Sequence, residues 1–253
     1  MKNSAAGGGG FLLFTLGGVP STQSCVPDCV GNKGRPNKPF PPPPPTCQCL
    51  VNNHGTPSGG VNEFCVGASV AHAATPYGPW TQYPNVVPKA TNPSAVVFEN
   101  GTVLLAARHS AISVHDPCSL HIYVADDYRG PYRLVNNCTG VSEDPFLWRD
   151  ARGFHILTHV KQGEYPTWYA DFGGVFSSPD GISWRGPARE YAYNTTVANG
   201  WAGRGGNTTL SARQRPFLLV ENSTRYLFNA VGLPGIDHWS FGCNFVQQVD
   251  MSP

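Results

Sequence analysis

Two short motifs built on proline recur in step along the chain, and this repeat constrains the fold more than any other feature. One is a Gly-Pro pair, found at Tyr77-Gly-Pro-Trp80, Arg129-Gly-Pro-Tyr132 and Arg185-Gly-Pro187. The other is a polar residue before proline, found at Asn92-Pro93, Asp144-Pro145 and Arg215-Pro216. The first two copies of each motif are 52 residues apart. A sequence period of this length is typical of folds built from repeated supersecondary units.

Apolar segments and turns divide each unit into about four short antiparallel strands. The clearest pair is Phe146–Trp148 and Phe154–Thr158, joined by the turn Asp150-Ala-Arg-Gly153, in which glycine supplies a positive φ. The high content of Gly (29) and Pro (24) suits many turns, and no segment has a clear helical period. Units of this size are typical of propeller blades. We therefore predict an all-β fold, a β-propeller of four-stranded antiparallel blades; a β-sandwich is the alternative.

The composition excludes several classes of function. Only 13% of the 253 residues are charged and the net charge is +1, so we expect no nucleic-acid partner. No apolar run is long enough to span a bilayer, so no membrane span is predicted. We expect a monomer.

Cysteines and glycosylation sequons favour the secretory pathway. The chain has eight cysteines and five Asn-x-Ser/Thr sequons, at Asn100, Asn137, Asn194, Asn207 and Asn222. Together they predict a secreted, extracellular glycoprotein with disulfides.

Three regions are predicted along the chain. Residues 1–24 are a signal peptide or a disordered N-terminus, with the apolar run Phe11–Leu16 as the candidate signal core. Residues 25–62 are a linker rich in cysteine and proline, and residues 63–253 are the propeller. The linker contains a stiff run, Pro41–Pro45, and two close cysteine pairs. Those pairs favour local disulfides over a zinc site, and the pairing of the other cysteines stays open.

Blade geometry gathers charged and aromatic residues on one face. In an up-and-down blade, the loop before the first strand and the loop between the second and third strands open on the same side. This face receives the candidate site residues Asn92, Arg108, His109, Asp116, Glu143, Asp144, His159, Glu164, Trp168, Gln214 and Arg215. A ligand site is expected there.

The segment from Gly67 to Val249 resembles the five-bladed β-propeller glycosidases of glycoside hydrolase family 43 and the arabinanase/levansucrase superfamily. The most specific part is Glu143–Gly153, which is similar to the third-blade motif of the family: Asp-Pro, an apolar strand and a turn. Ser177–Trp184 is similar to structural turns common in these blades. The resemblance implies a five-bladed propeller, here with an incomplete first blade, because the linker precedes Ala68.

The resemblance also implies a chemistry. Family members invert the sugar configuration with one carboxylate as base and one as acid, separated by room for a water, while a third orients the substrate. Asp144 matches the orienting carboxylate. The place of the acid holds Gln214, which cannot donate a proton as an acid, and the first-blade base is not found. Asp116 and Glu164 are candidate replacements; for each, the alternative that the sequence favours is an ordinary loop residue.

The remaining candidates would bind the sugar. Arg108 and His109 suit a hydroxyl or carboxylate of the ligand, or else a salt-bridged rim. Trp168 suits stacking on a sugar face, although tryptophans at blade junctions are often core residues. Glu143 either contributes to the site or points away from it and pairs with an arginine.

Three functions remain open on the sequence. The first is a secreted glycosidase that acts on polysaccharide, the second a non-catalytic propeller that binds polysaccharide or oligosaccharide, and the third an extracellular interaction module. No cofactor is expected, apart from a calcium ion that some relatives hold near a histidine resembling His238. No metal-ligating residues are assigned.

Overall fold

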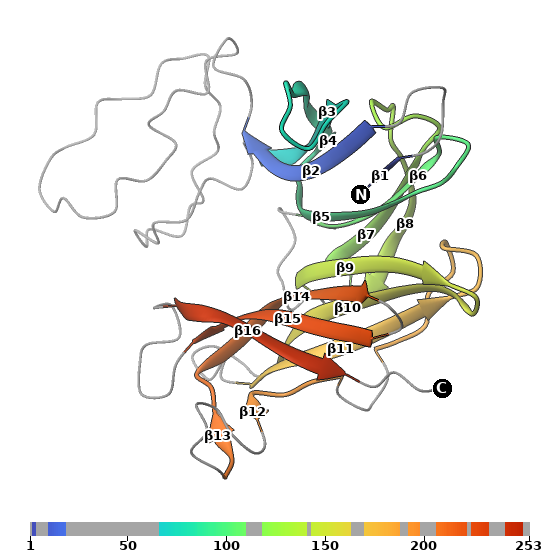
Figure 1. Ribbon diagram of the computed structural model, residues 1–253. Helices are drawn as coiled ribbons and strands as arrows, with labels where there is room; N and C mark the ends of the chain where they lie inside the picture. The colour runs from blue at the N-terminus through green and yellow to red at the C-terminus, as the bar shows by residue number, and fades with distance from the viewer. Residues whose placement is uncertain are drawn as a thin grey trace, which may run out of the picture.

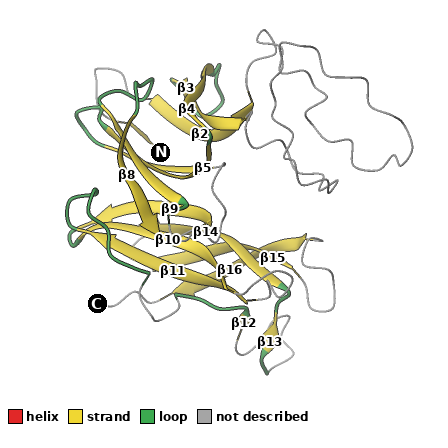
Figure 2. Ribbon diagram, turned by 180° about the vertical axis from the view of Figure 1, so that it is seen from behind, coloured by secondary structure: helices red, strands yellow, loops and turns green. Residues whose placement is uncertain are grey.

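The computed structural model describes residues 2–3, 10–18, 66–109, 118–140, 143–162, 170–187, 192–197, 206–221, 224–232 and 241–249. These residues form strands and loops only, as Figure 2 shows, and the all-β prediction is confirmed. Within these ranges, no helix is long and apolar enough to cross a lipid bilayer.

The first sheet begins earlier in the chain than predicted. It consists of β1 (Lys2–Asn3), β2 (Gly10–Gly18), β3 (Val66–Ala73) and β4 (Thr81–Pro88), in that order. β2 pairs antiparallel with β3 from Phe11 to Gly18. Its apolar residues alternate between the two faces of the sheet: Leu12 is 5% exposed and Leu13 is 49% exposed. The prediction that the first blade begins at Ala68, after the linker, is therefore wrong. The apolar run Phe11–Leu16, assigned to a signal core, lies in β2 and pairs with β3.

Three further antiparallel sheets follow in the chain, one of four strands and two of three. The second contains β5 (Ala90–Val97), β6 (Val103–His109), β7 (Leu120–Ala125) and β8 (Arg133–Gly140). The third contains β9 (Glu143–Asp150), β10 (Gly153–Gln162) and β11 (Ala170–Ser178). The fourth contains β14 (Ala212–Glu221), β15 (Thr224–Gly232) and β16 (Phe241–Val249). A short hairpin, β12 (Thr196–Val197) and β13 (Thr208–Thr209), lies between the third and fourth sheets in the chain.

The sheets follow one another in space in the order of the chain (Figure 1). β2 contacts β5, β5 contacts β9 and β9 contacts β14, so strands near the inner edges of successive sheets meet. A hydrophobic core fills each junction, centred on Leu105 between the first and second sheets, Ile156 between the second and third, and Leu157 with Leu227 between the third and fourth. This is the packing of propeller blades. The resemblance implies five blades, and the described residues build four.

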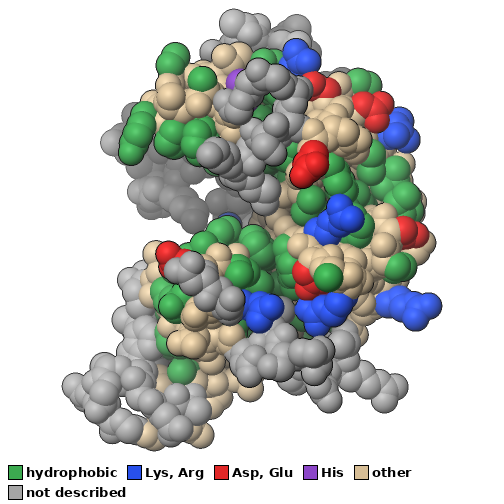
Figure 3. All heavy atoms as spheres, turned by 45° about the vertical axis from the view of Figure 1, so that its right-hand side comes forward, with side chains coloured by type: hydrophobic (Ala, Val, Ile, Leu, Met, Phe, Trp, Pro, Cys, Tyr) green, Lys and Arg blue, Asp and Glu red, His purple; other side chains and the backbone are tan. Residues whose placement is uncertain are grey.

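Charged side chains of both signs lie among apolar patches on the face seen in Figure 3, and the molecule is hollowed between its upper and lower parts in this view. The last sheet keeps large apolar side chains at the surface, with Phe217 50% exposed and Val246 48% exposed.

The sequence repeat is a repeat of backbone structure. All three Gly-Pro pairs are cis peptide bonds. The residue before each proline of the second motif has a positive φ, at 53° for Asn92, 52° for Asp144 and 51° for Arg215. The strand register also shifts by a bulge at each of these three positions. The three copies of the second motif therefore mark equivalent positions in successive blades.

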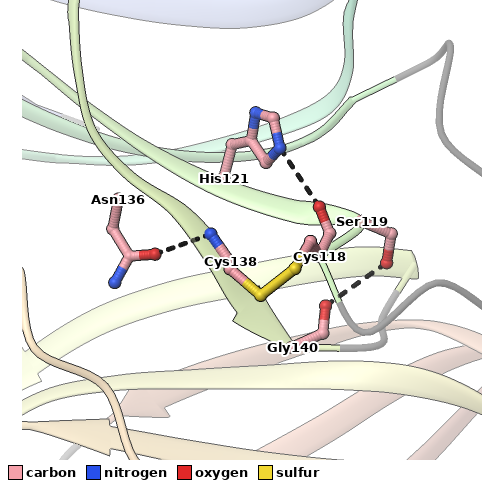
Figure 4. The surroundings of a disulfide bond; sticks show 6 residues. All are labelled: Cys118, Ser119, His121, Asn136, Cys138 and Gly140. Atoms are coloured by element: carbon pink, nitrogen blue, oxygen red, sulfur yellow. Dashed lines mark hydrogen bonds between the residues drawn. A yellow bond between two sulfur atoms is a disulfide. The ribbon is translucent and has the colours of Figure 1, made fainter.

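Two local features brace the blades. Cys118 and Cys138 form a disulfide that ties the start of β7 to β8 (Figure 4). The turn around Asp180 is structural, as predicted, because the Asp180 carboxylate accepts hydrogen bonds from the backbone amides of Ile182 and Ser183. The other predicted disulfides lie outside the described residues.

Candidate functional site

Asp144 stands at the start of β9, where the backbone is held in an unusual conformation. Its φ of 52° is rare for a residue other than glycine, and Pro145 restricts the chain immediately after it. The carboxylate is only 7% exposed. A buried carboxylate held by a positive φ at a bulge is a feature that recurs at functional sites.

The partners of Asp144 come from the equivalent positions of the two neighbouring blades. The Asn92 amide Nδ2 donates a hydrogen bond to Asp144 Oδ1. Arg215 Nη1 lies 3.6 Å from the same oxygen, and the Arg215 side chain is 68% exposed. The repeat thus places an amide, a carboxylate and a guanidinium in a row across three blades.

His159 approaches the carboxylates from the second strand of the same blade. It lies opposite Glu143 in the register of β9 and β10, and it is fully buried. Its Nδ1 is 3.8 Å from Asp144 Oδ2 and 4.0 Å from Glu143 Oε2. Glu143 therefore contacts the cluster through His159.

The neighbours keep Asp144 ionised. Burial by itself would raise the pKa of this carboxyl, but the approach of His159, the positive charge of Arg215 and the Asn92 amide together hold the pKa below its ordinary value. At neutral pH Asp144 is therefore a hydrogen-bond acceptor and a negative charge. It cannot serve as a proton donor in that state.

Gln214 occupies in the fourth blade the place that Glu143 has in the third. Each precedes the residue with positive φ, and each pairs with the second strand just before the bulge. Gln214 is 7% exposed, and its backbone carbonyl accepts a hydrogen bond from Asn229 Nδ2 at 3.3 Å. This equivalent position thus carries an amide where the third blade carries a carboxylate.

Arg108 and His109 extend the polar cluster into the second blade. Arg108 is buried and pairs with Thr91, the residue before Asn92. Burial lowers the pKa of His109, and the nearby charges of Lys89 and Arg108 add to this effect. At neutral pH His109 is accordingly an uncharged imidazole.

Most of the predicted site residues that the structure describes lie in one region. Asn92, Glu143, Asp144, His159 and Arg215 are joined by the contacts above. Three candidates, Asp116, Glu164 and Trp168, lie outside the described residues, as does His238. Among the residues that the structure describes, no group of three or more His, Cys, Asp or Glu side chains could hold a metal ion, the Glu143, Asp144 and His159 group included.

Two supporting residues were not singled out from the sequence. Ser94 Oγ accepts a hydrogen bond from the Leu147 backbone amide at 2.9 Å and so links β5 to β9 near the site. Arg213 is 2% exposed, and its guanidinium lies 4.6 Å from the Tyr193 ring and 5.1 Å from the Phe245 ring. No pattern in the sequence predicted its burial.

No protein-family model and no curated protein matches the chain. Solved structures of glycoside hydrolases do match it. An exo-1,5-alpha-L-arabinanase from a bovine ruminal metagenomic library has a TM-score of 0.53 at 9% identity, over 74% of this chain and 66% of that one. A GH43_12 protein retrieved from a capybara gut metagenome has a TM-score of 0.52 at 16% identity, over 73% of this chain and 35% of that one. A xylan beta-1,4-xylosidase from Bacillus halodurans C-125 has a TM-score of 0.50 at 16% identity, over 74% of this chain and 36% of that one.

These likenesses concern the fold and not the activity, since the identities are between 9% and 16%. The chain spans 35–66% of the length of the three structures. They confirm that the chain has a β-propeller fold of the kind found in family-43 glycoside hydrolases.

Proposed function

We propose that this protein is a glycan-binding propeller that uses a glycosidase-like fold to hold a polysaccharide or oligosaccharide at Asp144. The observation that carries the proposal is the buried, ionised Asp144 carboxylate with an exposed guanidinium beside it. A carboxylate of this kind accepts hydrogen bonds from sugar hydroxyls, and charge-assisted bonds are stronger than neutral ones.

Binding without hydrolysis is favoured because neither Asp144 nor Gln214 can supply a proton. Inverting hydrolysis needs a protonated acid as well as an ionised base. Asp144 is ionised, and the equivalent position in the fourth blade carries Gln214. Neither side chain supplies the acid.

Hydrolysis is the second candidate function, and it rests on Glu143. This second carboxylate lies 4.0 Å from His159 Nδ1, beside Asp144. It would act with a carboxylate from Asp116 or Glu164, the candidates outside the described residues.

The test measures binding and sugar release together. The full-length protein is incubated with arabinan, xylan and galactan, and with aryl-furanosides, and Asp144→Asn is run beside it. We expect retention on at least one polysaccharide, no release of sugar, and loss of retention in the variant. Release that disappears in Asp144→Asn would replace binding by hydrolysis, and the absence of both retention and release would refute a glycan site at Asp144.

We also propose that the protein is secreted. The Cys118–Cys138 disulfide supports this, because such bonds persist in oxidising compartments. Recovery of the protein from the culture medium, with Cys118 and Cys138 resistant to thiol alkylation, is the expected result. Retention inside the cell with both thiols reactive would contradict it.

A further inference from the structure

We propose that Asn100 and Asn194 carry N-linked glycans. Both residues begin sequons, Asn100-Gly-Thr102 and Asn194-Thr-Thr196, and both are exposed. Many sequons arise by chance and are not used, so the motif alone does not distinguish them. Their local structure does.

Each of the two side chains is oriented by its own sequon. The Asn100 Oδ1 accepts a hydrogen bond from the Thr102 backbone amide at 3.1 Å, and the Asn194 Oδ1 accepts one from the Thr196 amide at 2.8 Å. The carbonyl end of each side-chain amide is therefore held against the backbone. The Nδ2 atom, to which a glycan is attached, is left as the free end of an exposed side chain.

Both sequons lie on well-anchored backbone. The amide of Gly101 donates to the Phe98 carbonyl at 3.0 Å in the turn between β5 and β6. The carbonyl of Asn194 accepts a hydrogen bond from Arg213 Nη1 at 3.1 Å, and the neighbouring Tyr193 is buried. The backbone conformations of the two sequons are thus set by hydrogen bonds of the folded protein.

The chemistry needs only the ordinary donor of the secretory pathway, a polyprenyl pyrophosphate oligosaccharide. Asn Nδ2 forms a bond to C1 of the first sugar and loses one proton. The bond between C1 and the pyrophosphate oxygen breaks, and the pyrophosphate leaves with its electron pair. No redox step occurs.

The disulfide is an independent observation that fits the compartment in which this transfer occurs (Figure 4). It also separates these two sequons from a third. Asn137 is exposed too, but its sequon contains the disulfide-bonded Cys138, and Thr139 is only 7% exposed. We therefore expect lower occupancy at Asn137 than at Asn100 and Asn194.

A glycan at Asn100 would leave the candidate site open. Asn92 lies near the start of β5, and Asn100 lies in the turn that follows its other end, beyond five strand residues (93–97) that span about 17 Å. This proposal does not depend on glycan binding at Asp144.

The test is site-specific mapping on the full chain, secreted from eukaryotic cells behind a heterologous signal so that entry does not depend on the chain's own N-terminus. Peptide N-glycosidase in ¹⁸O water converts each occupied asparagine into a mass-marked aspartate. We expect marks at Asn100 and Asn194, each abolished by the matched variant Thr102→Ala or Thr196→Ala. Asn136 is the control for background marking: its Oδ1 accepts the same kind of hydrogen bond, from the Cys138 amide, but its Nδ2 donates to the Ile182 carbonyl at 2.8 Å and no Ser or Thr follows two residues on.

An unmarked Asn100 or Asn194 in protein recovered from the medium would overturn the proposal for that residue, provided that a co-secreted glycoprotein is marked. Cys118→Ser sharpens the contrast with Asn137, because it removes the disulfide without changing the sequon. We expect the mark at Asn137 to rise in this variant, and an unchanged mark would contradict the role given to the disulfide.

Discussion

The two ends of β9 carry the same three residue types in different settings. At one end, Asp144 meets His159 and Arg215. At the other, Asp150 accepts hydrogen bonds from His155 Nε2 at 2.9 Å and from Arg152 Nη2 at 2.8 Å. Asp144 is 7% exposed and Asp150 is 32% exposed.

The difference between them is where the partners come from. The partners of Asp150 lie within five residues along the chain, so its cluster is part of a hairpin and forms with it. Asp144 is bound by Asn92, 52 residues away, and by Arg215 of the next blade, so its cluster exists only when three blades have packed together. An aspartate, a histidine and an arginine in proximity thus do not define a site. The two clusters differ in burial and in whether their partners come from separate blades.

The largest contrast is expected from the two histidines. His159→Ala removes a fully buried ring and leaves a cavity beside two carboxylates, which should lower the free energy of unfolding by about 2–4 kcal/mol. His155→Ala removes a ring that is 8% exposed and stacks on Trp148, within a cluster whose aspartate is 32% exposed, and should lower it less, by about 1–2 kcal/mol. Urea unfolding of both variants measures this. Equal losses would show that the two clusters are energetically alike.

A second contrast lies in the pH dependence of stability. The pKa of Asp144 is below its ordinary value in the folded protein, so the unfolded chain binds a proton more readily at this position. Its contribution to stability is therefore present above about pH 4 and is lost as the pH falls through the folded pKa. Hydrogen bonds from Arg152 lower the pKa of Asp150 as well, but this group is exposed and solvent screens it.

We expect Asp144→Asn to flatten the acid limb of the stability curve more than Asp150→Asn does. Thermal unfolding between about pH 2 and pH 5 checks this. His109 and His121 act in a separate window, because burial lowers the pKa of both and their contribution is lost as the pH falls below about 6.5. A steeper effect from Asp150→Asn would contradict the greater weight given to the buried cluster.

The smallest effects are expected from the two arginines. Arg215 is 68% exposed and Arg152 is 49% exposed, so each charge pair should be worth about 0–1 kcal/mol. Neither Arg215→Gln nor Arg152→Gln should change the free energy of unfolding by more than that. Only Arg215→Gln should raise the pKa of Asp144, which ¹³C NMR titration of the carboxyl would follow. An unchanged pKa of Asp144 in Arg215→Gln would show that Arg215 does not interact with this carboxylate.

Much of the fold could be predicted because its repeat consists of residues with strong backbone preferences. Prolines and the residues before them restrict φ and ψ, and each motif has the same backbone feature in three blades: a cis bond at the Gly-Pro pairs, and a positive φ before the proline of the second motif. The start of the first sheet could not be predicted. Phe11–Leu16 reads as an apolar run, and only its pairing with β3 shows that alternate residues face opposite sides.

The candidate site was only partly predictable for the same reason. Equivalent positions in successive blades face one axis, so the repeat alone predicted that Asn92, Asp144 and Arg215 lie in one region. The burial of His159 and Arg213 depends on the packing between blades, and a lone histidine or arginine carries no sign of it in the sequence.

The most direct test of the account is a calorimetric titration at pH 7 with an oligosaccharide from the polysaccharide that retains the protein. The wild-type chain, Asp144→Asn and the matched control Asp150→Asn are compared. Loss of one charge-assisted hydrogen bond is worth about 1.5–3 kcal/mol, so we predict affinity roughly tenfold to a hundredfold weaker in Asp144→Asn and unchanged in Asp150→Asn. Equal affinity in all three proteins would contradict the assignment of the glycan site to Asp144.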